Sequence, residues 1–301
     1  MSDYKAVRST VEISRRIMEL LEKVDPQYYD GTRREKSIHF LNDILQERSY
    51  MPLRVLIAEM KHTCGDRYAG ETDAICQEIQ DFQTQKKLLK QPYQGHSGKE
   101  YRFDTYDGDP EYPLKIIDQQ LFDRAAKDGF PPDFFRKSYF DGVTIYCMPD
   151  GTDLSFSEFH DCTFAVCRIH GAIFDGSRLY QCNFHSCDLF SSTFFAASFA
   201  HTHFYDSSLS LISLQRARLA HCNTIDCNMD RVSFLNATLN GCCYGRVTPS
   251  NIEYLHTATV TQGGATEEEC QQNRAAIYKA LNAANPPTHP DQHRRRSDPE
   301  R

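Results

Sequence analysis

Cysteine and histidine are the residues of this 301-residue chain whose side chains offer the most chemistry. Of its twelve cysteines, eight lie between residues 151 and 248. Seven of these eight are separated by multiples of five residues: Cys162, Cys167, Cys182, Cys187, Cys222, Cys227 and Cys242. A structural zinc site needs ligands that converge tetrahedrally, usually from close cysteine pairs or imidazoles. Even spacing does not supply such convergence, so we expect these thiols to fill small apolar spaces, with redox or metal chemistry as the alternative.

The histidines of the same stretch occupy polar positions. They are His160, His170, His185, His201, His203 and His221. None has an Asp or Ser at a spacing that forces a catalytic triad, so we interpret them as surface histidines, with a pH-sensitive interface as the alternative.

Elsewhere in the chain, the run from His62 to Asp66 holds a nucleophile, Cys64, and a base. Residues adjacent in sequence rarely form a catalytic unit, however. The sequence also lacks a phosphate loop, Rossmann glycines, a zinc-protease motif and a nucleophile elbow. We therefore expect no enzyme activity, no cofactor and no metal.

These cysteines and histidines belong to a repeat of five residues. A large apolar residue recurs at nineteen positions from Leu154 to Tyr244, with Thr224 as the one exception, and a small residue stands two positions before each, except at Ile212. A period of five matches neither an α-helix nor a flat strand. The chain must therefore turn a corner once per repeat, so that each unit points the same two side chains inward and successive coils stack like parallel strands.

Units such as Cys182-Asn183-Phe184-His185-Ser186 and Ala217-Arg218-Leu219-Ala220-His221 resemble the pentapeptide-repeat family. The resemblance covers about a third of the chain and implies a right-handed, four-sided parallel β-helix with four repeats per coil. Nineteen units then give four to five coils and a rod of roughly 23 Å. It also implies that residues twenty apart stack, so that the seven cysteines form two neighbouring columns about 4.8 Å apart along the rod.

The whole chain is expected to be an α+β protein. Residues 1–90 read as a small α-helical domain, because Ser9 and Glu12 form a capping box ahead of an amphipathic stripe and further stripes follow. We assign 91–112 to a linker, 113–150 to a helix and strand that cap the solenoid, and 151–248 to the solenoid itself. A helix opened by Thr266 is expected within a C-terminal cap, 249–285, and 286–301 is expected to be a disordered tail.

The chain carries a net charge of −7, and no segment is basic enough for a nucleic-acid footprint. It shows no signal peptide and no apolar run long enough to span a membrane. We therefore expect a cytoplasmic protein with no direct binding to nucleic acid or membrane.

The position after each large inward residue should face solvent, yet four such positions hold aromatic residues: Tyr180, Phe190, Phe195 and Tyr205. Exposed aromatics mark interaction sites, so these four are the predicted partner surface unless other parts of the chain cover them. The first functional hypothesis is accordingly a non-catalytic protein–protein interaction module on a pentapeptide-repeat rod. Homodimerisation through the C-terminal helix is a further partner hypothesis.

Two alternatives come from other classes. Some members of the resembling family antagonise DNA gyrase as DNA mimics and confer quinolone resistance, which implies a topoisomerase partner. Here the acids are scattered, and Arg178 and Arg218 share a column with Glu158, which interrupts an acidic face. The second alternative is an unrecognised enzyme or effector activity in the N-terminal helical domain.

Overall fold

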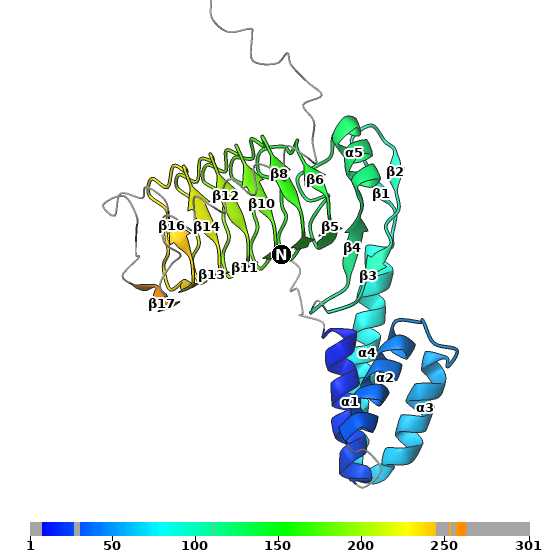
Figure 1. Ribbon diagram of the computed structural model, residues 1–301. Helices are drawn as coiled ribbons and strands as arrows, with labels where there is room; N and C mark the ends of the chain where they lie inside the picture. The colour runs from blue at the N-terminus through cyan, green and yellow to red at the C-terminus, as the bar shows by residue number, and fades with distance from the viewer. Residues whose placement is uncertain (1–7, 27–30, 110, 245–252, 254–256, 263–301) are drawn as a thin grey trace, which may run out of the picture.

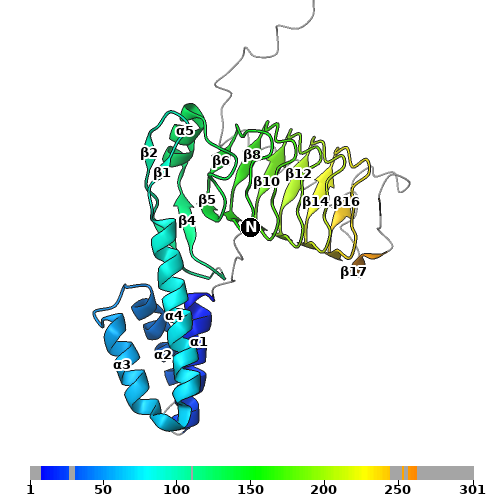
Figure 2. The same ribbon diagram turned by 180° about the vertical axis from the view of Figure 1, so that it is seen from behind.

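The computed structural model describes residues 8–26, 31–109, 111–244, 253 and 257–262 (Figure 1). A helical bundle and a β-solenoid meet at an angle, and each has a hydrophobic core of its own (Figures 1 and 2). The predicted α+β class, with a parallel β-helix after an N-terminal helical region, is confirmed. The helix expected from Thr266 and the tail 286–301 lie outside the described residues.

Four α-helices and one 3₁₀ turn make up the bundle. They are α1 (Thr10–Val24), α2 (Gly31–Leu45), α3 (Leu53–Cys64), the turn η1 (Asp66–Tyr68) and α4 (Ala69–Leu89). The predicted capping box starts α1, since Glu12 N–H donates to Ser9 Oγ at 3.1 Å and Ser9 N–H donates to the Glu12 carboxylate at 3.3 Å. Apolar stripes on these helices, including Ile17 and Phe82, form the bundle core. In the described part of the chain, no helix is both long and apolar enough to cross a membrane.

Asp107 attaches the bundle to the solenoid. Thr10 Oγ1 and Gln46 Nε2 both donate to its carbonyl oxygen, the first at 2.8 Å. Its carboxylate accepts from Lys86 Nζ at 2.8 Å, and the two side chains of this ion pair are only 10% and 13% exposed. Breaking such a pair leaves a desolvated charge without a partner, which typically costs about 3–5 kcal/mol. Helix α1, helix α4 and the residue directly after α2 are therefore tied to one residue that follows strand β3 (Thr105–Tyr106).

The segment between bundle and solenoid holds more strands than the sequence indicated. The stretch assigned to a linker contains β1 (Tyr93–Gln94), β2 (Glu100–Tyr101) and β3. The segment 113–150, expected to hold a helix and a strand, begins with a strand: Leu114–Ile117 form β4, and α5 (Gln119–Asp128) follows. Asp118 ends the strand and caps the helix, since its carboxylate accepts from Leu121 N–H at 2.7 Å.

The solenoid strands are β5 (Ser138–Asp141), β6 (Thr144–Ile145), β7 (Glu158–His160), β8 (Thr163–Ala165), β9 (Arg178–Tyr180), β10 (Asn183–His185), β11 (Ser198–Ala200), β12 (His203–Tyr205), β13 (Arg218–Ala220), β14 (Asn223–Ile225), β15 (Thr238–Asn240), β16 (Cys243–Tyr244) and β17 (Thr259–Gln262). They form two sheets, ordered β17-β15-β13-β11-β9-β7-β5-β4-β3 and β16-β14-β12-β10-β8-β6. From β7 to β16 each residue pairs with the one twenty positions later, as Phe164 does with Phe184. Isolated parallel bridges, such as Ile173 to Thr193 and Asp188 to Ser208, form the other two sides.

The four sides and the twenty-residue coil therefore agree with the sequence, but the number of coils does not. Strands β4 and β5 precede the repeat in the same sheet and β17 follows it, so the stack is longer than four to five coils. Neither β4 nor β5 belongs to the five-residue pattern, which is why counting repeats missed them.

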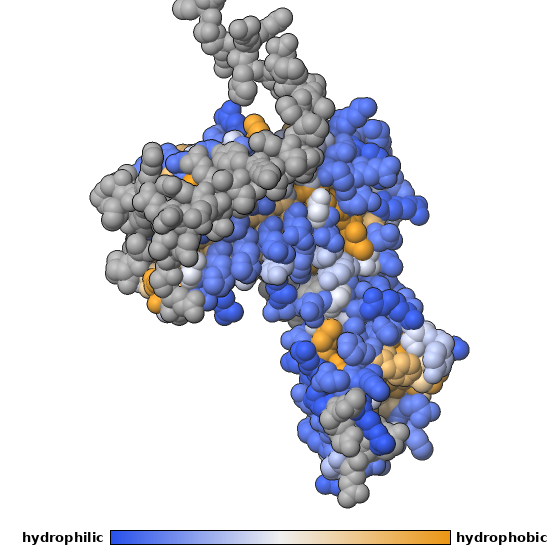
Figure 3. Space-filling model, viewed as in Figure 1, coloured by the Kyte–Doolittle hydropathy of each residue, from blue (hydrophilic) through white to orange (hydrophobic). Residues whose placement is uncertain are grey.

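Large inward residues stack along the axis of the solenoid. The rings of Phe164 and Phe184 are 4.2 Å apart and those of Phe184 and Phe204 are 4.6 Å apart, nearly parallel in both pairs. At the N-terminal end, Phe122 of α5 and Phe134 continue the same core. On the part of the solenoid surface that Figure 3 shows in colour, the residues are mostly hydrophilic.

The corners have a left-handed backbone. Two residues after each large inward residue, φ is positive at all eighteen positions from Phe156 to Gly241, and fifteen of these residues are not glycine. This conformation costs a non-glycine residue roughly 1–2 kcal/mol. It lets the corner N–H donate to the next coil, as Val166 N–H does to His185 O at 2.9 Å and His201 N–H to Ala220 O at 2.9 Å.

Replacing a strained corner residue by glycine should stabilise the solenoid. Val166 is β-branched, has φ 52° and is 65% exposed, so its side chain contributes little burial. We expect Val166→Gly to raise the free energy of unfolding by about 1 kcal/mol, because the relieved strain exceeds the entropy gained by the unfolded chain.

Denaturant unfolding measures the difference. Gly171→Ala is the matched control: it adds a Cβ with no atom within 4 Å at a corner of φ 65° and should destabilise by about 1 kcal/mol. Equal stability of Val166→Gly and the parent would contradict the strain at the corners.

Candidate functional site

The four predicted aromatic residues do not come together. Tyr180, Phe190 and Phe195 are 44%, 42% and 39% exposed, but Tyr205 is only 1% exposed and packs with Ile225 and Cys243. The twenty-residue register places each of the four on a different side of the solenoid. Tyr205 was thus wrongly expected to face solvent, and no single flat surface contains the other three.

The seven repeat cysteines point inward with free thiols, while Cys243, outside their columns, is disulfide-bonded. Their sulfurs donate to backbone carbonyls, as Cys187 Sγ does to Phe164 O at 3.2 Å. Burial raises the pKa of the Cys182 thiol well above its ordinary value and raises the pKa of Cys227 to about 12. Their inward position and their hydrogen bonds to backbone carbonyls support the space-filling interpretation. Among the residues with described positions, no group of three or more His, Cys, Asp or Glu could hold a metal ion.

The histidines have individual environments. His160 Nε2 lies 2.6 Å from the Glu158 carboxylate, and this hydrogen bond raises the pKa of His160. His170 Nε2 lies 2.8 Å from Asp188, and the rings of His201 and His221 stack. His203 is half-buried, and burial lowers its pKa to about 4, which keeps the ring neutral.

Two other titratable groups belong to the packing rather than to a site. Cys64 is buried in the bundle, where burial raises the pKa of its thiol, whereas His62 is exposed, so the two do not form a nucleophile–base pair. Lys115 Nζ donates to Phe134 O and lies 5.1 Å from the centre of the Phe103 ring. Burial lowers the pKa of Lys115 to about 8.

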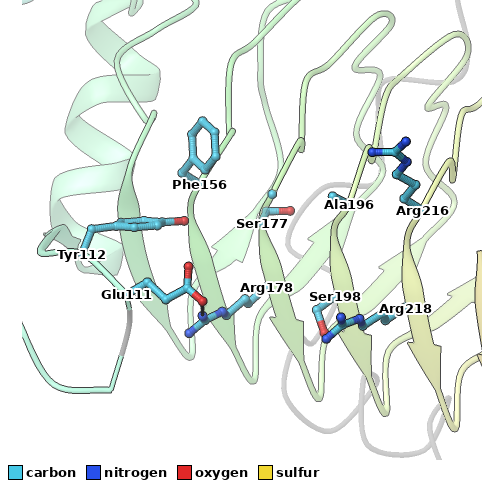
Figure 4. Close-up of a pocket in the computed structure, with 10 residues that line it drawn as sticks. Glu111, Tyr112, Phe156, Ser177, Arg178, Ala196, Ser198, Arg216 and Arg218 are labelled. Atoms are coloured by element: carbon cyan, nitrogen blue, oxygen red, sulfur yellow. Dashed lines mark ion pairs between the residues drawn. The ribbon is translucent and has the colours of Figure 1, made fainter. Parts of the chain in front are cut away.

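A groove of about 720 Å³ runs along one edge of the solenoid (Figure 4). Its floor and one wall come from the solenoid, and two further residues come from the segment before β4. The lining residues are Glu111, Tyr112, Phe156, Gly176, Ser177, Arg178, Ala196, Ser198, Arg216 and Arg218.

Small residues in the middle coils create the floor. Phe156, Gly176, Ala196 and Arg216 are the corner residues of four successive coils, so large side chains stand at the two ends and small ones between them. A Cβ on Gly176 would lie 2.8 Å from the Phe156 ring, so glycine is needed for the ring to take this position. The Tyr112 ring meets Phe156 edge-on with 5.9 Å between centroids, which makes this end of the groove aromatic.

Three arginines give the groove its positive charge. Strands β9, β11 and β13 pair in register and align Arg178 with Ser198 and Arg218. The Cα atoms of the two arginines are therefore two coils, or about 10 Å, apart. Arg178 lies 3.3 Å from the Glu111 carboxylate, and the Arg216 guanidinium lies 5.7 Å from the Phe195 ring centre. Within the described ranges, no carboxylate forms an ion pair with Arg216 or Arg218.

Guanidinium groups in such an arrangement bind carboxylates or phosphates through paired N–H donors. The lining residues include neither histidine nor cysteine, and Ser177 Oγ already donates to Phe174 O. The geometry therefore suits the binding of an anion.

The sequence alone did not predict a groove at these arginines. It indicated only that Arg178 and Arg218 interrupt an acidic face, and it gave no role to Arg216. A usable signal was present, because the twenty-residue coil implied by the resemblance places Arg178 and Arg218 in one column with the small residue Ser198 between them. Nothing in the repeat could show that Glu111 and Tyr112 would reach the same edge.

The buried thiols predict a pH dependence of stability. Because the folded pKa of Cys227 is about 12 and lies above the unfolded value, its thiol stabilises fully below about pH 8.5, and that stability is lost as pH rises toward 12. The free-energy cost of Cys227→Ala should therefore be about 1–2 kcal/mol smaller at pH 10 than at pH 8.

Denaturant unfolding of both proteins at the two pH values gives this double difference. Cys147→Ala is the control, since Cys147 is exposed and its cost should not change with pH. A pH-independent cost of Cys227→Ala would mean that its thiol is accessible to water.

Comparison with known proteins finds similarity to pentapeptide-repeat proteins. A family model for pentapeptide repeats matches residues 212–243 in eight copies, whereas a search of curated proteins gives no match. The pentapeptide repeat protein Rfr23 from the cyanobacterium Cyanothece 51142 is 15% identical over 39% of this chain and 86% of its own, with a TM-score of 0.30. QnrB1, a plasmid-mediated fluoroquinolone resistance protein, is 14% identical over 51% of this chain and 92% of its own, with a TM-score of 0.31.

A pentapeptide repeat protein from the thylakoid lumen of Arabidopsis thaliana is 17% identical over 37% of this chain and 65% of its own, with a TM-score of 0.21. The family match and the four-sided, twenty-residue coils agree on the repeat itself. The repeat segment of this chain is a pentapeptide-repeat solenoid.

Proposed function

We propose that this chain is a non-catalytic protein-interaction module whose solenoid groove binds an anionic segment of a protein partner. The observation that carries the proposal is the position of Arg216 and Arg218. Both are exposed, and both line the end of the groove that no described residue fills, beside a floor of small residues.

The groove is suited to binding because its floor is rigid. Every coil beneath it is hydrogen-bonded to its neighbours, for example through Ser198 N–H to Ser177 O at 2.8 Å and Arg218 N–H to Ala197 O at 2.9 Å. A preorganised surface loses little conformational entropy when a ligand binds. A hydrogen bond to a charged group is typically worth about 1.5–3 kcal/mol, and less where solvent screens it.

A protein segment suits this surface better than nucleic acid does. Binding to a phosphate backbone draws on many cations spread over a broad surface, whereas this chain is acidic overall, at −7. Three arginines confined to one groove match a few carboxylates of a peptide instead.

Charge reversal in the groove should abolish partner binding. We expect Arg218→Glu in the full chain to weaken binding at least tenfold, because it replaces an attractive contact by a repulsive one. Arg168→Glu is the matched control, since Arg168 is also exposed, precedes a large inward residue and lies on another side of the solenoid.

Affinity capture from the native cell with these three baits identifies candidates, and calorimetry with the purified partner measures the affinities. The expected result is a partner that binds the parent and the Arg168→Glu control with equal affinity. Equal weakening by both substitutions, or by neither, would exclude the groove as the binding surface.

The DNA-mimic alternative, with a topoisomerase as partner, requires a continuous acidic face. The register from Glu158 to Arg178, Ser198 and Arg218 interrupts one side, and the Glu158 carboxylate is occupied by His160. We therefore expect the purified protein to leave DNA supercoiling by gyrase unchanged at micromolar concentrations. Inhibition in that range, measured on agarose gels beside a heat-denatured sample, would favour the mimic instead.

A further inference from the structure

One end of the groove is already filled by a short segment of the chain itself. Glu111 places its carboxylate 3.3 Å from Arg178, and the next residue, Tyr112, packs its ring against Phe156. Tyr112 is only 9% exposed. An acidic residue followed directly by an aromatic one therefore fits an arginine and the aromatic surface beside it (Figure 4).

The arginine of this arrangement recurs two coils further along, whereas the aromatic corner residue does not. Arg218 occupies the same column as Arg178, and translation by two coils moves one position onto the other over about 10 Å. Ala196 stands where Phe156 stands at the filled end, which leaves space above the floor. Arg216 lines that space, and its guanidinium lies 5.7 Å from the ring centre of Phe195, one of the four aromatic residues of the predicted partner surface.

The two ends differ in occupancy and share their chemistry. At the filled end Arg178 pairs with Glu111, and the Phe156 ring has the Arg136 guanidinium 5.9 Å from its centre. The other end presents Arg218 and Arg216, with the Phe195 ring 5.7 Å from the Arg216 guanidinium. A carboxylate can pair with the Arg218 guanidinium, while a planar ring can stack on Arg216, which attracts the face of an aromatic group. The distance between the ends, about 10 Å, corresponds to roughly three residues of extended peptide.

We infer that the unfilled end of the groove binds an acidic residue followed directly by an aromatic one, within an extended segment of a protein partner. The acidic residue pairs with Arg218, and the aromatic ring packs against Arg216 and Phe195. This inference rests on the proposed function and specifies the class of its ligand. Glu111 and Tyr112 stay in place and form the neighbouring wall.

A labelled peptide with this chain's own sequence from Asp107 to Tyr112 is the probe, since it ends in the same Glu-Tyr pair. Fluorescence anisotropy with the full-length protein at low salt measures the dissociation constant, because screening weakens exposed charge pairs. We expect saturable binding, weakened about tenfold when the probe's Glu is replaced by Gln and also weakened when its Tyr is replaced by Ala.

On the protein, Arg218→Gln and Phe195→Leu should each weaken binding of the probe, the first by about tenfold. Arg168→Gln should leave it unchanged, and circular dichroism verifies that each variant is folded. Equal binding of the Gln probe, or equal binding by Arg218→Gln, would overturn the inference.

The inference and the proposed function can fail separately. If the probe does not bind at millimolar concentration while a captured partner still depends on Arg218, the acidic–aromatic specificity is wrong and the interaction groove stands. If partner binding does not depend on Arg218 either, both are wrong.

Discussion

A left-handed backbone turn once in every five residues is the constraint on which the solenoid depends. Each turn costs a non-glycine residue roughly 1–2 kcal/mol, whereas burial of one large inward side chain contributes about 1.5–3 kcal/mol. Every repeat therefore compensates for its own corner, with hydrogen bonds between coils added to the burial. The corner also directs backbone N–H groups toward the next coil, which keeps the register at twenty residues from β7 to β16.

The same register builds the floor of the groove, and a segment held by the bundle supplies the remaining wall. Columns of side chains place Arg178 and Arg218 on one line, and the corner glycine, Gly176, lets the Phe156 ring lie over the floor. The remaining wall comes from a segment anchored in the bundle. Asp107 is bound by Thr10, Gln46 and Lys86, and four residues later Glu111 reaches Arg178. The helices thereby limit how far the Glu111–Tyr112 wall can move from the solenoid.

Much of the fold could be predicted because the five-residue period is a local property of the chain. It specified the inward residues and the role of the cysteines, and the family resemblance that it carries implied the four sides. It could not reveal β4 and β5, which join the sheet through backbone pairing without the pattern, nor the burial of Tyr205, which depends on contacts with Ile225 and Cys243. The groove was missed for a related reason. Its arginines lie in the repeat, but Glu111 and Tyr112 come from outside it, and only the folded chain brings them together.

The twenty-residue coil also limits how such a chain can change in length. An insertion of five residues between Arg178 and Arg216 would preserve the repeat and the core, yet it would advance every later residue by one side of the rod. Arg216 and Arg218 would then leave the edge that carries Arg178. An insertion of twenty residues would keep the sides aligned and move the two ends of the groove apart by one strand spacing, about 4.8 Å. The fold can thus accept an insertion of one five-residue repeat, whereas the groove stays on one edge only when the insertion is a full coil of twenty residues.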